Sequence, residues 1–177
     1  MVEISESYRG SGHRPWMRST VDRLLHSVPP ELLSGLGRVI LTDAESIGRG
    51  KTRRVRGRKY DRNKCLGFYH PRTRDETAWS ELVADNIAPG VPRPLLGLQF
   101  IRDMVVSQTL FHEIGHHLDT TVASGARGGE AAAEDWCRRL SRTHFLKRYW
   151  YLKPVAKAGL IFIAVIRRLT SRLSGPA

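Results

Sequence analysis

The order of the predicted elements indicates an α+β fold. Three short runs of strand character, at residues 38–42, 66–70 and 77–87, lie in the first half of the chain. Long stretches with helical periodicity follow residue 100. We therefore expect a short mixed or antiparallel sheet packed on helices. A length of 177 residues with 41% hydrophobic content suits a single domain, residues 1–177, with one core.

The elements before residue 100 are expected in chain order. Residues 1–14 are predicted to be flexible, and residues 15–27 to form a helix that Pro29 and Pro30 end. A turn at residues 31–36 leads into the first strand. Residues 86–97 contain three Pro and two Gly, which is typical of a loop that crosses to the next element.

The most informative motif lies in a helix predicted from residue 100 onwards. Residues 100–111 contain neither Pro nor Gly, and their apolar residues recur at helical spacing. His112, Glu113 and His116 continue this run as H-E-x-x-H. Because positions i and i+4 lie one above the other on a helix, the two imidazoles can bind one metal ion, with the Glu113 carboxylate beside a water on that ion. Zinc suits such a site, since it binds neutral imidazole and leaves a position open for water. The alternative is a buried helix with two structural histidines.

Gly115 lies between the two histidines, where a glycine weakens a helix by about 1 kcal/mol relative to Ala. We therefore expect another stretch of backbone to approach the helix closely at this residue. Apolar residues are expected to bury the helix on more than one side; they are Ile101, Met104, Val105, Phe111, Ile114 and Leu118.

A third metal ligand must come from another part of the chain, and the acidic residues downstream are the candidates. Asp119 follows His116 on the same helix, too close to bind the metal from the opposite side, but able to orient His116 by a hydrogen bond. After a turn-rich break, residues 130–140 are predicted to form a second helix. Glu130 and Glu134 share a face of that helix, so one can bind zinc while the other hydrogen-bonds a ligand histidine. The alternative is an acidic first turn that faces solvent.

The motif H-E-I-G-H-H followed by E-x-x-A-E-x-W resembles the gluzincin metallopeptidases, in particular their small minigluzincin members and, more distantly, the IrrE/ImmA-type regulatory peptidases. In those families the first Glu of the second motif is the third zinc ligand. The resemblance therefore implies Glu130 as a ligand, Ala133 as a small residue packed near the site, Glu134 as a residue that contacts a ligand, and Trp136 as the aromatic that follows.

The resemblance covers about residues 60–150 and implies a zincin-like fold, in which a peptide substrate lies along the sheet edge as an added strand. One departure from the family is the spacing. Glu130 follows His116 by fourteen residues, a shorter interval than in the larger thermolysin-like enzymes, and this leaves Glu134 as an alternative ligand.

The predicted activity is zinc-dependent hydrolysis of a peptide bond in a protein or peptide substrate. Glu113 is the expected general base and proton shuttle. The resemblance also implies a hydrogen-bond donor to the developing oxyanion, and the candidates are His117, His144, Tyr149 and Tyr151.

Two other interpretations remain open. The first is a non-catalytic regulatory protein, in which zinc holds the fold while a basic surface docks on an anionic membrane or nucleic acid. Glu113 argues against it, because a structural site has no need of a carboxylate beside an open metal position. The second is a latent peptidase, in which a segment carrying Cys65 or His13 occupies the fourth metal position.

Basic residues dominate two segments of the chain, which has a net charge of +12. Residues 49–74 contain eleven Lys or Arg and one acid, Asp61, and residues 138–172 contain ten Lys or Arg and no acid. The first segment includes a basic loop or hairpin at residues 49–64. Such clusters favour a polyanionic partner, which is nucleic acid, an anionic lipid surface or an acidic protein. The alternative is a solvated basic surface without a specific partner.

The C-terminal sequence joins aromatic, apolar and basic residues. Tyr149 and Tyr151 precede residues 154–166, which are almost wholly apolar, and Arg residues follow. About twenty apolar residues are needed to span a bilayer, so this stretch is too short. We predict a helix at residues 154–172 that packs in the core or in a homodimer interface or, alternatively, lies on a membrane surface.

The two cysteines, Cys65 and Cys137, lie far apart and indicate neither a disulfide framework nor a structural zinc site. The N-terminal sequence lacks a basic region followed by an apolar run, as a secretory signal would have. These observations predict a cytoplasmic protein, with membrane association as an additional option.

Overall fold

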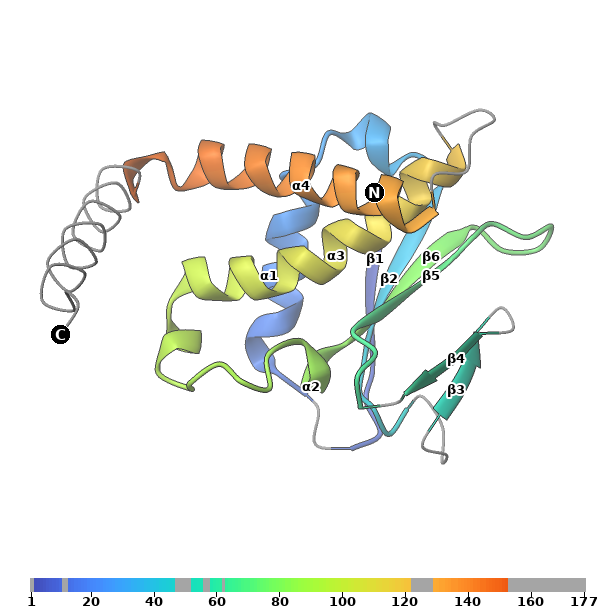
Figure 1. Cartoon of the computed structure of the whole chain (residues 1–177), viewed down its shortest axis with the longest axis horizontal. Coiled ribbons are helices and arrows are strands. Elements are labelled where there is room, and N and C mark those ends of the chain that lie inside the picture. Colours follow the sequence, from blue (N-terminus) through green and yellow to red (C-terminus); the bar gives the residue numbers. More distant parts are fainter. Residues whose placement is uncertain are drawn as a thin grey trace, which may run out of the picture. The chain divides into compact units, whose positions relative to one another are not determined.

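The computed structural model describes residues 2–10, 13–46, 52–55, 58–61, 63–121 and 129–152. It divides into two compact units, residues 1–142 and 143–177, and the boundary falls inside helix α4 (Gly129–Arg148). The first unit is α+β, as predicted, and contains the sheet and the H-E-x-x-H helix (Figure 1). The helix predicted at residues 154–172 lies outside the described residues.

The main sheet has four strands and is mixed, as expected. Its strands, in spatial order, are β1 (Glu3–Ser7), β2 (Leu36–Thr42), β6 (Ala78–Val83) and β5 (Gly67–His70). β1, β2 and β6 are parallel, and β5 runs antiparallel to β6 as the last strand of the described sheet. Helices α1 (Pro15–Leu25) and α3 (Gln99–Thr121) cover one face of this sheet (Figure 1).

Strand β1 corrects the expectation that residues 1–14 are flexible. It pairs in register with β2, placing Ile4 beside Val39. Beyond the strand, the buried Asp43 carboxylate accepts hydrogen bonds from the backbone N–H groups of Arg9 (3.0 Å) and Gly10 (2.6 Å). The segment is held by backbone pairing with β2 and by a residue distant in sequence, Asp43. Because the strand itself is short and has few apolar residues, it left no periodic signal in the sequence.

Two further segments differ from or refine the expected boundaries. The third strand ends at Val83, and the chain turns into the short helix α2 (Ala84–Ile87), where the Asp85 carboxylate accepts a hydrogen bond from the backbone N–H of Ala44 at 3.0 Å. The basic segment contains an antiparallel hairpin of β3 (Thr52–Val55) and β4 (Arg58–Asp61). Three 3₁₀ turns complete the described elements; they are η1 (Pro30–Leu33), η2 (Leu95–Gly97) and η3 (Trp150–Leu152).

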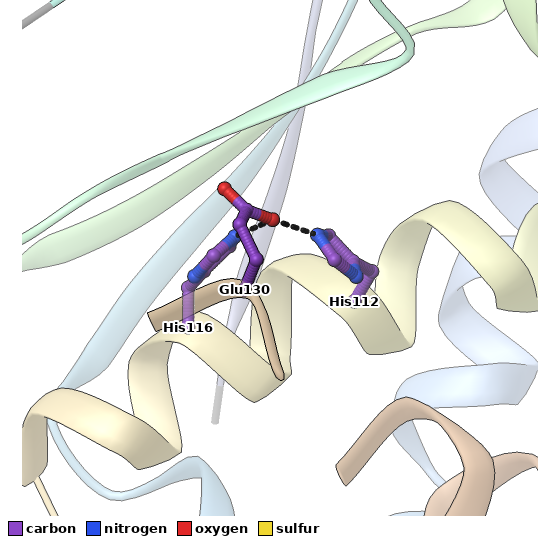
Figure 2. A group of neighbouring side chains, drawn as sticks. All are labelled: His112, His116 and Glu130. Atoms are coloured by element: carbon purple, nitrogen blue, oxygen red, sulfur yellow. Dashed lines mark ion pairs between the residues drawn. The ribbon is translucent and has the colours of Figure 1, made fainter. Parts of the chain in front are cut away.

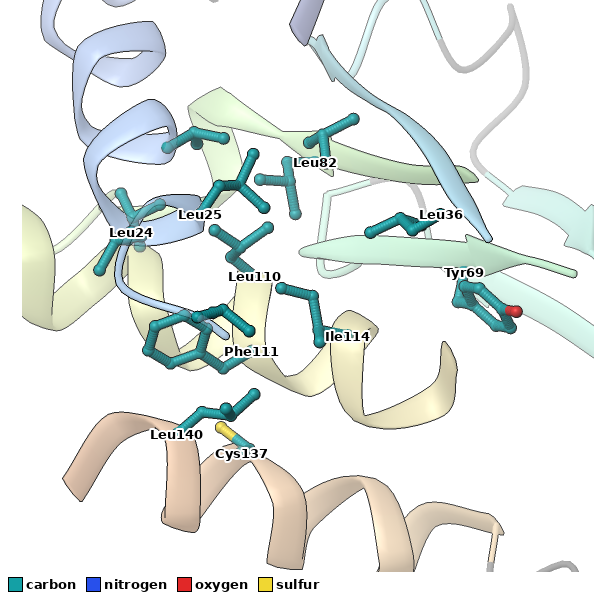
Figure 3. Packing of buried hydrophobic residues seen from close by; sticks show 14 of the residues in the cluster. Leu24, Leu25, Leu36, Tyr69, Leu82, Leu110, Phe111, Ile114, Cys137 and Leu140 are labelled. Carbon is teal, nitrogen blue, oxygen red and sulfur yellow. The ribbon is translucent and has the colours of Figure 1, made fainter. Parts of the chain in front are cut away.

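Helix α3 is buried from two sides, as its sequence predicts, except that Met104 is 38% exposed. Figure 3 shows Leu110 directed toward Leu82 of the sheet and Leu25 of α1. On the side of α3 away from the sheet, Phe111 faces Leu140 of α4. The sheet, the pair α1 and α3, and the first part of α4 therefore form successive layers around one core.

An ion pair fixes α1 on α3. Asp103 is fully buried, and the guanidinium of Arg23 donates to its two carboxylate oxygens, with Nε at 3.1 and 3.3 Å. Removal of one partner of such a buried pair typically costs about 3–5 kcal/mol. The pair therefore holds the first half of α3 in place, and the H-E-x-x-H motif follows in the second half of the same helix.

Candidate metal centre

Three predicted ligands meet at the point where α3 passes the start of α4. Figure 2 shows the imidazoles of His112 and His116 projecting from successive turns of α3 toward the carboxylate of Glu130. One oxygen, Oε2 of Glu130, lies 3.2 Å from Nε2 of His112 and 3.6 Å from Nε2 of His116. The potential ligand atoms of the three residues all lie within 4.8 Å of one another.

The separations between Glu130 and the two histidines are compatible with a zinc site. Four ligands placed tetrahedrally at zinc's usual bond lengths are separated by about 3.3 Å along each edge. The two distances from Glu130 to the histidines, 3.2 and 3.6 Å, are close to that value. Two imidazoles and one carboxylate are also the donor set of a catalytic zinc site, which keeps a fourth position for water.

Glu134, the alternative ligand, lies on the other side of a histidine ring. Its Oε2 is 3.7 Å from Nδ1 of His112, whereas Glu130 faces Nε2. A carboxylate hydrogen-bonded to the second ring nitrogen orients the ring toward a metal. At 3.7 Å Glu134 lies near that nitrogen but beyond hydrogen-bond distance, so the geometry favours Glu130 as ligand, and the orienting role of Glu134 stays a prediction.

Asp119 contributes by joining the two helices. Its buried carboxylate accepts a hydrogen bond of 3.1 Å from the backbone N–H of Gly129, the first residue of α4. Gly129 has a positive φ of 56°, a conformation that glycine adopts without steric cost. Glu130 is the next residue, so this bond helps to place the third candidate ligand. The predicted contact of Asp119 with His116 remains a prediction.

The close approach predicted at Gly115 is confirmed. A β-carbon at this residue would lie 2.8 Å from Cα of Ala133 and would also clash with the Ala133 carbonyl oxygen. Ala133 itself is fully buried. The small residues Gly115 and Ala133 therefore let α4 cross α3 between His112 and His116, which brings Glu130, one turn earlier on α4, close to both histidines.

Glu113 follows the candidate ligand His112 in the chain, and its side chain is buried. Its side chain is 6% exposed. Burial, followed by the negative charge of Glu130, raises the pKa of Glu113 from 4.5 to about 8. A buried carboxylate next to a cluster of metal-binding side chains is an arrangement common at functional sites.

Strand β5 supplies a wall that the sequence did not reveal. A β-carbon at Gly67 would lie 3.0 Å from Oε1 of Glu113 and 2.9 Å from the carbonyl oxygen of Glu81. The missing side chain thus lets the strand backbone approach the Glu113 carboxylate. A glycine at the start of a strand pattern is the signal that could have indicated such an approach.

The pairing of β5 determines which way its backbone groups point. The carbonyl of Leu66 accepts a hydrogen bond from the N–H of Val83 at 2.8 Å. Because hydrogen-bonded pairs alternate along an antiparallel ladder, the next residue, Gly67, directs its N–H and C=O away from β6. These groups face the side of the sheet on which a further strand would add.

His117 is not part of the cluster, although it follows His116 directly. Its Nε2 donates to the carbonyl oxygen of Ser34 (2.9 Å), which can only accept, so Nδ1 accepts from the hydroxyl of Tyr69 (3.2 Å). Burial lowers the pKa of His117, and the bond to Ser34 opposes this. His117 therefore links α3 to β5 as a neutral, buried side chain.

The other three candidate donors belong to the second unit, residues 143–177. There, His144 and Tyr149 are buried and pack with ring centroids 6.1 Å apart, while Tyr151 is exposed. Their suggested role in catalysis remains a prediction.

Cys65 and His13 were considered as groups that could occupy the fourth metal position, and both pack against other residues. Cys65 is buried in a small apolar cluster with Ala44, Phe68 and Val83. The ring of His13 packs edge-on against Tyr8, with centroids 5.2 Å apart. Neither residue belongs to the group of potential ligands found among the described residues.

Comparisons with protein-family models, with curated proteins and with solved structures found no match to this chain. The class of the protein therefore has to be inferred from the site itself.

Proposed function

We propose that the protein is a zinc-dependent peptidase of the gluzincin type, with His112, His116 and Glu130 as the metal ligands. The observation that carries the proposal is the meeting of these three side chains from two helices, with the buried carboxylate of Glu113 beside them. A purely structural metal site does not require a buried acid of this kind. The zincin-like character of the fold belongs to the same proposal.

The residues of the site have different roles in the proposed reaction. Zinc held by these ligands would polarise the scissile carbonyl, lower the pKa of a neighbouring water and favour the ionised form of Glu113. Glu113 then accepts a proton from the attacking water and delivers it to the nitrogen of the leaving amine. Gly67 and the burial of Glu113 hold this carboxylate in one place, which orients it toward the water.

The substrate class follows from β5. A peptide in extended conformation can pair with the outward-facing backbone groups of Gly67, as an added strand next to the sheet. In that position its backbone lies beside the Glu113 carboxylate, which contacts the same glycine. A protein or peptide is therefore the substrate that this arrangement suits.

The decisive experiment combines metal analysis with a trapped substrate. The purified protein should contain about one zinc per chain, and Glu130→Ala should weaken zinc binding much more than Glu134→Ala, because only Glu130 is a direct ligand. Glu113→Gln should retain zinc and the fold. Proteins captured by this variant supply candidate substrates for the wild type.

On such a substrate, loss of the general base in Glu113→Gln should lower the rate of hydrolysis about 10²–10⁴-fold. Glu31→Gln is the matched control, since it makes the same change in an exposed side chain outside the cluster. Equal rates for the wild type and Glu113→Gln would exclude the peptidase and leave the non-catalytic, zinc-containing regulatory protein. Full zinc binding by Glu130→Ala, with loss in Glu134→Ala, would reverse the ligand assignment.

A further inference from the structure

The second unit exposes aromatic and basic side chains together at the end of its described part. Leu146, Trp150 and Tyr151 are 43%, 65% and 52% exposed. Lys147 and Arg148, between them in the sequence, are exposed as well. We refer to these five residues as the aromatic–basic patch.

The exposure of the patch is selective within its own unit. His144 and Tyr149 are buried, and Phe145 stacks on Tyr149 with ring centroids 5.7 Å apart and an interplanar angle of 27°. The N–H of Tyr149 donates to the carbonyl of Phe145 in the last turn of α4 at 3.0 Å, and the N–H of Leu152 donates to the carbonyl of Tyr149 at 2.9 Å. Some aromatic rings of this segment therefore form its interior, while Trp150 and Tyr151 remain outside. Large apolar side chains that are exposed side by side mark interaction surfaces.

The positive charge of this region favours a partner that carries negative charge. From residue 136 to residue 177 the sequence contains ten Lys or Arg and no Asp or Glu. An anionic partner is therefore favoured, and the two main classes are nucleic acids and membranes with anionic lipids.

The apolar residues decide between these two partners. Trp and Tyr are the side chains enriched at the interface between lipid and water. Leu146, and the aliphatic residues at positions 154–166 of the sequence, suit acyl chains, whereas an aliphatic side chain gains little from a phosphate backbone. Within the described part of the chain, no helix is long and apolar enough to cross a membrane.

We propose that the aromatic–basic patch docks the protein on the surface of membranes that contain anionic lipids. Trp150 and Tyr151 insert at the level of the head groups, and Lys147 and Arg148 bind the lipid phosphates and carboxylates. The proposal depends neither on the metal centre nor on hydrolysis.

The test uses the full chain and sedimentation with two kinds of vesicle, phosphatidylcholine alone and phosphatidylcholine with phosphatidylserine. The wild type should bind the anionic vesicles, and Trp150→Ser combined with Tyr151→Ser should abolish most of this binding. Leu95→Ser combined with Leu98→Ser is the matched control, because these residues are 43% and 55% exposed in the first unit. The control should bind as the wild type does.

The basic residues are tested in the same assay. Lys147→Gln combined with Arg148→Gln should reduce binding about 5-fold for each charge removed. Arg138→Gln combined with Arg142→Gln removes the same charge from exposed positions earlier on α4 and should have a smaller effect. Equal losses in both pairs would mean that net charge alone, and not the patch, is responsible.

Fluorescence provides a measurement that does not depend on stability. Lipids brominated near the head groups should quench part of the Trp emission of the wild type, and Trp150→Ser should lose this quenching. The proposal is overturned if the double aromatic variant binds anionic vesicles as the wild type does, since residues 153–177 would then account for the binding. It is equally overturned if the wild type does not bind vesicles but binds an oligonucleotide through the same residues.

Discussion

Replacement of Glu113 by Gln should stabilise the metal-free protein near neutral pH. In the folded chain, burial and the charge of Glu130 raise the pKa of Glu113 from 4.5 to about 8. In the unfolded chain the carboxyl group ionises near its ordinary pKa. Between these two pKa values the folded state keeps a proton that the unfolded state has released, so the free energy of unfolding decreases as the pH rises.

The size of the effect follows from the width of that pH interval. Each pH unit above 4.5 lowers the stability by about 1.4 kcal/mol, until the group ionises in the folded state near pH 8. At pH 7 the loss amounts to about 3 kcal/mol. Gln has a similar shape and does not ionise, so the variant avoids this loss.

The measurement is urea unfolding of wild type and Glu113→Gln in the presence of a chelator, at several pH values from 4.5 to 8. The difference in the free energy of unfolding should be small at the acidic end and should grow steadily toward neutral pH. Glu76→Gln, in a side chain that is 59% exposed, controls for the loss of a carboxylate as such. A difference that does not vary with pH, or a variant that is less stable than the wild type at pH 7, would refute the reasoning.

Two glycine substitutions test how the backbone shapes the site. Gly115→Ala places a β-carbon against the backbone of α4, so it should cost about 1–3 kcal/mol in urea unfolding and should weaken zinc binding in a metal titration; unchanged zinc affinity would contradict the role of this contact. Gly67→Ala should displace the Glu113 carboxylate and lower the rate of hydrolysis about 10²-fold while zinc is retained, and a rate equal to that of the wild type would contradict it. Gly97→Ala is the control for both, because a β-carbon there meets no atom within 4 Å.

The parts of the fold that could be predicted from sequence are those encoded by periodicity. α3 was predicted from apolar residues at helical spacing in a stretch without Pro or Gly, and β2 and β5 were predicted from short apolar runs. All three are present within a few residues of the expected bounds. β1 was missed because it is held by pairing with β2 and by hydrogen bonds to Asp43, which is distant in sequence. Contacts of that kind leave no local pattern.

The candidate site, like the fold, could be predicted only in part. His112, His116 and Glu130 were brought together on spacing and on resemblance, and the structure places them in one cluster. Gly67, by contrast, contacts Glu113 across forty-six residues of sequence, and only the packing of β5 on α3 reveals it. Zinc, peptide hydrolysis and a polyanionic partner of the basic segments remain predictions.

The crossing of α3 and α4 at Gly115 and Ala133 has a consequence for how relatives of this chain would be recognised. The position of Glu130 depends on that crossing and on the bond from Gly129 to Asp119. Neither contact depends on the length of the connection between the helices. The interval of fourteen residues between His116 and Glu130 is then free to drift during evolution, whereas the two small residues are not. A sequence pattern that requires a small residue inside the first motif and another three places after the glutamate, with any length between them, should select such proteins better than one that specifies the interval.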